Sequence, residues 1–137
     1  METRFAGQWY WMGNGYTGWE GSKPEWMFYA SLIQLGYQPG EDFAYQSPLL
    51  GGRLDKGGYI IDFVFHNPPG LAVNVQGIYY HYELGADTIG RDRVVRELLA
   101  LQGITLIFVD EDDLEQDPSG VTESALQFRD TSRLGGR

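Results

Sequence analysis

Three polar side chains interrupt two apolar segments of the chain, where each is costly unless it is hydrogen-bonded or binds a ligand. Asp62 lies inside the run Tyr59–Phe65, and Asn74 and Gln76 lie inside the run Leu71–Gln76. A buried polar group without a partner costs roughly 1–3 kcal/mol. Side chains two residues apart on a strand share a face, which places Asn74 and Gln76 together opposite Asp62. This grouping indicates a binding or catalytic site; a closed hydrogen-bond network without a ligand is the alternative.

The elements that would position these side chains follow from capping, turn and periodicity signals. Turn residues at HNPPG separate two strands, and a continuous apolar run predicts a strand buried on both faces. The expected order is a helix from the Ser22–Glu25 capping box to Gly36, strands at 42–46, 59–65 and 71–76, a helix at 87–102, a strand at 104–109, an acidic helix start at Asp110 and a last helix after Pro118. For the first helix, the predicted apolar face consists of Trp26, Tyr29, Ala30, Ile33 and Leu32. The order predicts a small α/β sandwich with a mixed sheet.

The charge and the residue composition of the chain argue against several classes of function. The 137 residues carry a net charge of −9 and only ten Lys and Arg, which argues against tight, sequence-independent DNA binding. A weak or metal-bridged contact with nucleic acid remains compatible with this charge. There is no cysteine, and no apolar run approaches the roughly 18 residues of a membrane-spanning helix. We expect a cytoplasmic protein without a membrane partner.

The chain divides into an arm at 1–21, one domain at 22–130 and a tail at 131–137. The arm holds five of the nineteen glycines and three of the four tryptophans, Trp9, Trp11 and Trp19. Its rings should dock either on its own domain or on a protein partner, and an oligomer is compatible with the second case.

The order of these features resembles the restriction-endonuclease-like superfamily with the PD-(D/E)xK core. It is most similar to very-short-patch mismatch-repair endonucleases and their stand-alone, often phage-encoded relatives. The resemblance extends from Glu25 to about Phe128. It implies an αβββαβ core with a mixed sheet flanked by helices, and a Mg²⁺- or Mn²⁺-dependent DNA endonuclease or nickase.

The resemblance also implies roles for individual residues. Asp62 in IIDF matches the metal-binding Asp, Asn74-Val75-Gln76 occupies the (D/E)xK position, and His81 in GIYYH matches a catalytic histidine. The implied metal ligands are Glu25, Asp62, Asn74 and the Val75 carbonyl. The implied catalytic residues are Asp62, His81 and Gln76. Arg91-Asp92-Arg93 matches a helix start, and the implied nucleic-acid contacts are Arg91, Arg93 and Lys56.

Two of the three core positions depart from the family pattern. Asn74 stands in place of a carboxylate and Gln76 in place of Lys. A neutral amide oxygen can ligate a hard cation, but Gln cannot donate a proton as an acid at neutral pH. Asp62 with His81 remains a route to catalysis. The alternative is a catalytically inactive nuclease-like module, serving as a phage structural, assembly or accessory interaction protein in the host cytoplasm or the virion.

Several of these residues also have a purely structural explanation. Glu25 completes the capping box, His81 can pack beside Tyr79 and Tyr80, and the Arg91/Arg93/Arg96 trio can form a solvated helix face. The acids from Asp110 to Glu115 are typical of a helix start stabilised by the helix dipole.

Overall fold

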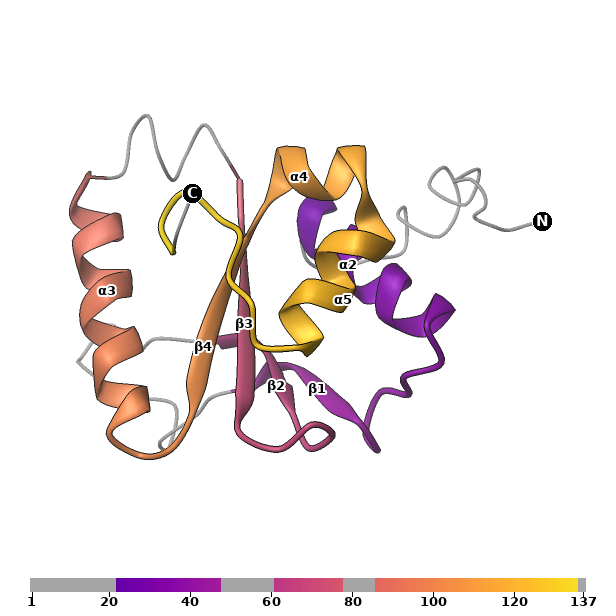
Figure 1. Ribbon diagram of the computed structural model, residues 1–137, viewed down its shortest axis with the longest axis horizontal. Helices are drawn as coiled ribbons and strands as arrows, with labels where there is room; N and C mark the ends of the chain where they lie inside the picture. Colours follow the sequence, from indigo (N-terminus) through magenta and orange to yellow (C-terminus); the bar gives the residue numbers. More distant parts are fainter. Residues whose placement is uncertain (1–21, 48–60, 78–85, 136–137) are drawn as a thin grey trace.

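The computed structural model of the chain describes residues 22–47, 61–77 and 86–135. Its elements form a mixed α/β domain (Figure 1). They are α2 (Lys23–Gln34), β1 (Phe43–Ser47), β2 (Ile61–Phe65), β3 (Leu71–Gln76), α3 (Ala86–Ala100), β4 (Thr105–Asp110), α4 (Glu111–Gln116) and α5 (Pro118–Leu126). The four strands form one sheet in sequence order, antiparallel except for the parallel pair β3–β4. The predicted mixed sheet flanked by helices is confirmed.

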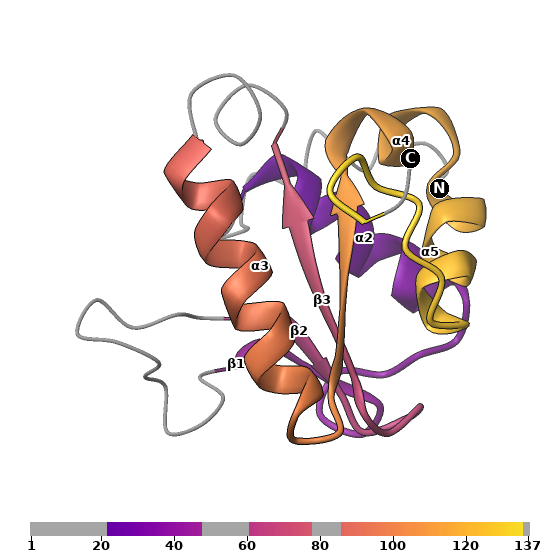
Figure 2. The ribbon, with the colours of Figure 1, turned by 60° about the vertical axis from the view of Figure 1, so that its left-hand side comes forward.

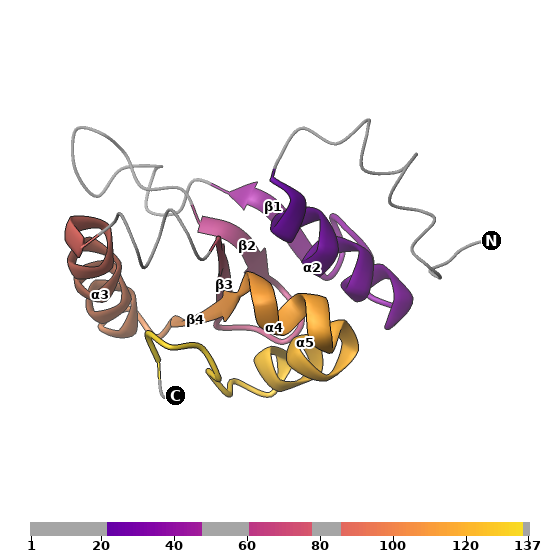
Figure 3. The ribbon, with the colours of Figure 1, turned by 90° about the horizontal axis from the view of Figure 1, so that it is seen from above.

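Helices cover both faces of this sheet. Figure 3 shows α3 on one side and α2, α4 and α5 on the other. Each side has its own apolar core. The larger one includes Phe28, Leu32, Phe43, Phe63, Val73 and Ile107; the smaller one, under α3, includes Ile61, Ala72, Val95, Leu99, Leu106 and Phe108.

Helix α2 begins at the predicted capping box. The Ser22 hydroxyl accepts a hydrogen bond from the Glu25 N–H at 3.3 Å, and the Glu25 carboxylate accepts one from the Ser22 N–H at 3.3 Å. The predicted apolar face is partly wrong. Phe28 and Leu32 are fully buried, whereas Ile33 is 45% exposed. Trp26, Tyr29 and Ala30 are partly buried against the same core, as predicted. The error therefore concerns Ile33, which lies outside the core, and Phe28, which the prediction omitted.

Helix α3 shows the same division between buried and exposed apolar residues. Val95 and Leu99 pack against β4, while Val94 and Leu98 are exposed, as is Leu101 just after the end of the helix. Figure 2 shows α3 lying along β3 and β4. The turn after α3 is joined to the β2–β3 turn by a hydrogen bond of 2.8 Å from the Thr105 N–H to the Gly70 carbonyl.

The C-terminal segment returns along β4. The Asp130 carboxylate accepts a hydrogen bond of 2.9 Å from the Phe108 N–H, and Leu134 is buried in the core under α3. Arg133 pairs with Asp110 at 3.1 Å and with Asp112 at 2.6 Å. Residues 130–134 are therefore part of the packed structure.

None of the helices in the described ranges combines the length and the apolar character needed to cross a bilayer.

Candidate functional site

Two long helices begin at one edge of the sheet, where the central strands carry polar residues. The strand directions place the carboxyl ends of β1, β3 and β4 and the start of β2 at this edge. Helices α2 and α3 begin at the same edge, from opposite faces of the sheet (Figures 1 and 3). Polar residues on all of these elements can therefore approach one another.

Strands β2 and β3 are joined at this edge by side chains. The two strands pair directly at Phe63↔Val73 and Val64↔Ala72. Beyond these pairs the Asn74 amide oxygen accepts a hydrogen bond of 2.7 Å from the Asp62 N–H. The Asp62 carboxylate in turn accepts one of 2.9 Å from the Val75 N–H. The predicted cross-strand neighbours Asp62 and Asn74 thus lie together, and each binds the backbone of the opposite strand.

Glu25 reaches the site from the first turn of α2. Its Oε1 atom accepts hydrogen bonds from the Tyr45 hydroxyl on β1 and from the Ser22 N–H. Burial raises the pKa of Asp62 well above its usual value, and the charge of Glu25 and a side-chain hydrogen bond with Glu25 raise this pKa further. Like charges in a partly dry site resist ionising together. A proton or a cation between Glu25 and Asp62 would relieve that repulsion.

Gln76 and Asp92 form the other side of the site. Both residues are 3% exposed, and the Gln76 amide nitrogen donates a hydrogen bond of 3.3 Å to the Asp92 carboxylate. The charge of Asp92 contributes to the raised pKa of Asp62. Among the described residues, the Gln76 amide oxygen has no hydrogen-bond partner.

Asp92 is a residue that sequence reasoning did not place in the site. It lies between Arg91 and Arg93, so the segment looked like a charged, solvated helix face. The available signal was its spacing, because Asp92, Val95 and Leu99 are at positions i, i+3 and i+7 and share the buried face of α3.

The other residues predicted for the site lie at its border or outside the described residues. Arg91 and Arg93 are exposed on α3 near the site. Val75 is 8% exposed on β3. His81 and Lys56 lie outside the described residues, as does the arm at 1–21.

A second acidic group lies at the start of α4. The carboxylate oxygens of Asp110, Asp112 and Asp113 are within 4.8 Å of one another. Arg133 binds two of these three acids, and its backbone N–H donates a further hydrogen bond of 3.0 Å to Asp110. This group is therefore already neutralised in part by the chain's own cation.

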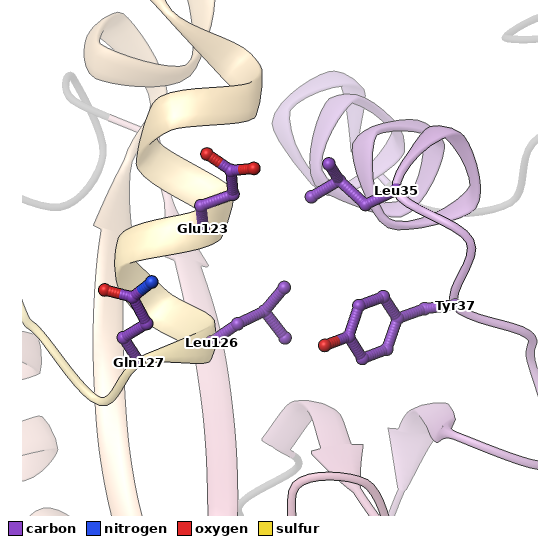
Figure 4. Close-up of a pocket in the computed structure, with 5 residues that line it drawn as sticks. All are labelled: Leu35, Tyr37, Glu123, Leu126 and Gln127. Atoms are coloured by element: carbon purple, nitrogen blue, oxygen red, sulfur yellow. The ribbon is translucent and has the colours of Figure 1, made fainter.

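A groove lies between the end of α2 and α5, as Figure 4 shows. Its volume is about 250 Å³, and it is lined by Leu35, Tyr37, Glu123, Leu126 and Gln127. It contains none of the predicted site residues, because the site lies at the opposite end of α2.

Comparison with known proteins adds no relative: no family model, no curated protein and no solved structure matches this chain.

Proposed function

We propose that this chain is a DNA-processing protein with a nuclease fold, and that Glu25 and Asp62 hold a Mg²⁺ or Mn²⁺ ion. The observation that carries the proposal is the approach of these two carboxyl groups, with the pKa of Asp62 raised by burial and by Glu25. A buried carboxyl group whose pKa is raised by burial and by a second carboxyl group is a candidate for a functional residue. The resemblance to restriction-endonuclease-like proteins supplies the reaction.

The residues present fit a hard divalent cation. The acidic and amide side chains described in the site offer oxygen atoms, and carboxylate and amide oxygens are the ligands that Mg²⁺ and Mn²⁺ accept. A bound cation would polarise a phosphodiester and lower the pKa of an attacking water. Tyr45 and the capping box orient Glu25, and the Val75 N–H orients Asp62. The Asn74 amide oxygen holds β2 beside β3 through its hydrogen bond from the Asp62 N–H. His81 remains the proposed acid or base.

A catalytically inactive nuclease-like module is the second candidate. The observation in its favour is Gln76, which stands at the expected lysine position and uses its amide nitrogen on Asp92. A neutral amide offers neither the positive charge nor the proton of a lysine. In this case a protein partner, bound through the arm at 1–21, would replace DNA chemistry in a phage particle or in an accessory complex.

Cleavage assays separate these candidates. Supercoiled, mismatched, branched and single-stranded DNA are incubated with the protein in Mg²⁺ and in Mn²⁺. The nuclease proposal expects cleavage by the wild type and a loss on the order of 10²-fold or more in Asp62→Asn. Glu97→Gln is the matched control, because Glu97 is an exposed acid of α3.

The outcomes are distinct. Cleavage that survives in Asp62→Asn would reject the proposed site. Cation binding without cleavage of any substrate would favour the inactive module, which then predicts an oligomer or a captured partner that is lost on deletion of residues 1–21. Light scattering and pull-down of the full chain and of the truncated chain measure this.

A further inference from the structure

The Gln76 side chain has a feature that the proposed Glu25–Asp62 cation does not use. Its amide oxygen is buried and has no hydrogen-bond partner among the described residues, although the residue is only 3% exposed. Buried polar atoms in native proteins nearly always have a partner, which is provided by protein, water or a bound ion. This oxygen therefore points to a bound species.

The orientation of the amide is fixed by its neighbour. The Gln76 amide nitrogen donates its hydrogen bond to the Asp92 carboxylate, so the amide oxygen is the atom left without a partner. The oxygen is thus available beside the Asp92 carboxylate. Together they offer a negative charge and a neutral oxygen, which are the donor types of a hard divalent cation.

The acids around Asp62 are arranged so that they offer two positions for a cation. Glu25 belongs to α2 and Asp92 to α3, and these helices cover opposite faces of the sheet (Figure 3), while the charges of both acids act on Asp62. Among the described residues, three acids have carboxylate oxygens that all lie within 4.8 Å of one another, and these are Asp110, Asp112 and Asp113. Glu25, Asp62 and Asp92 do not form such a trio, and the two acids that act on Asp62 come from helices on opposite faces of the sheet.

We propose that a second divalent cation, Mg²⁺ or Mn²⁺, binds on the α3 side of Asp62, between the Asp92 carboxylate and the Gln76 amide oxygen. The proposal rests on the proposed cation at Glu25 and Asp62, with Asp62 shared by the two ions. It gives Gln76 the role of a ligand at the position where the resemblance expects a lysine. A cation there would also offset the mutual repulsion of Asp62 and Asp92.

The test is the stoichiometry of Mn²⁺ binding, measured by electron paramagnetic resonance of the free ion with the full chain. The wild type is expected to bind two ions. Asp92→Asn, which keeps an acceptor for the Gln76 amide, and Gln76→Met, which removes only the amide, should each bind one, or bind the second at least tenfold more weakly. Glu25→Gln should retain the α3-side ion.

Two controls make the result specific. Glu97→Gln removes an exposed acid from the same helix and should leave two ions bound. Asp112→Asn tests the acidic group at α4 and should also leave two. Thermal unfolding of each variant establishes that it is folded, and Gln76→Met gives an independent answer if Asp92→Asn does not fold.

Failure of this inference and failure of the proposed function are distinguishable. One ion in the wild type, or two ions in both Asp92→Asn and Gln76→Met, overturns the second site and leaves a Glu25–Asp62 nuclease intact. Two ions without DNA cleavage support the second site and reject the nuclease. A wild type that binds no Mn²⁺ overturns both.

Discussion

At the scale of single residues, the site is built from side chains that also hold the backbone. Asp62 accepts a hydrogen bond from Val75 while it faces Glu25, and Glu25 caps α2 while it accepts from Tyr45. A group that is needed for function can be unfavourable for stability, because its charge is held in a poor environment. Asp62 is the clearest example here.

Replacing Asp62 with Asn should stabilise the metal-free protein at neutral pH. The pKa of the folded Asp62 is raised well above 3.8, so the folded protein binds this proton more tightly than the unfolded chain. Stability from this group is therefore lost as the pH rises from about 4 through the folded pKa. The Tm of Asp62→Asn in EDTA should exceed that of the wild type at pH 7.5, with the difference shrinking toward pH 4. A difference that is independent of pH would contradict this explanation.

Removing the Tyr45 hydroxyl should weaken both the fold and the cation site. Tyr45→Phe loses the hydrogen bond to Glu25, which costs about 1 kcal/mol. It also leaves Glu25 less well oriented, so Mn²⁺ affinity in calorimetry should fall several-fold. Tyr37→Phe, in the groove at the far end of α2, is the matched control. Unchanged Mn²⁺ affinity in Tyr45→Phe would separate Glu25 from the cation.

At the scale of elements, much of the fold could be predicted because it follows from local signals. The capping box before α2, the turn between β2 and β3, and the apolar run of β4 are each encoded by adjacent residues. The opposition of Asp62 and Asn74 also followed, since strand periodicity fixes which side chains share a face. These predictions required no knowledge of long-range packing.

The extent of the buried helix faces could not be predicted in the same way. In α2, the predicted face included Ile33, which is exposed, and omitted Phe28, which is fully buried, because packing on the sheet decides where the apolar face ends. In α3, the flanking arginines concealed the buried Asp92. The pairing of Arg133 with Asp110 joins residues 23 positions apart, and no local pattern predicts it.

The two faces of α3 should respond differently to truncation. Leu99 is fully buried against β4, and Leu98 is 40% exposed. Leu99→Ala should cost about 3 kcal/mol of unfolding free energy, whereas Leu98→Ala should cost less than about 1 kcal/mol. Urea denaturation of the two neighbouring variants measures the difference. Equal losses would place the core under a different face of the helix.

At the scale of the whole molecule, the returning C-terminal segment ties the acidic end of β4 to the core. Asp110 is fully buried, and its carboxylate is paired with Arg133. Arg133→Met should cost about 2 kcal/mol, because it leaves a buried carboxylate without its cation. Asp112→Asn, which loses the more exposed pair, should cost less than about 1 kcal/mol. Chemical denaturation of both variants compares the two pairs.

The net charge of −9 makes DNA binding dependent on bound cations if the proposed function holds. A strongly acidic surface repels phosphates, and Arg91 and Arg93 give only a small basic surface. Fluorescence anisotropy should show weak DNA binding in EDTA and binding at least tenfold tighter with Ca²⁺ or Mn²⁺. Glu25→Gln combined with Asp62→Asn should remove this dependence. Equal binding in EDTA would point to a contact outside the proposed site.

The join between β2 and β3 has a consequence for spectroscopy. The Val75 amide proton points at the Asp62 carboxylate, where a regular sheet would have given it a carbonyl. Its NMR chemical shift and its exchange with solvent deuterium will therefore follow the charge of that carboxylate. A single backbone resonance can then report when the site gains a proton or an ion, without any substitution in the site.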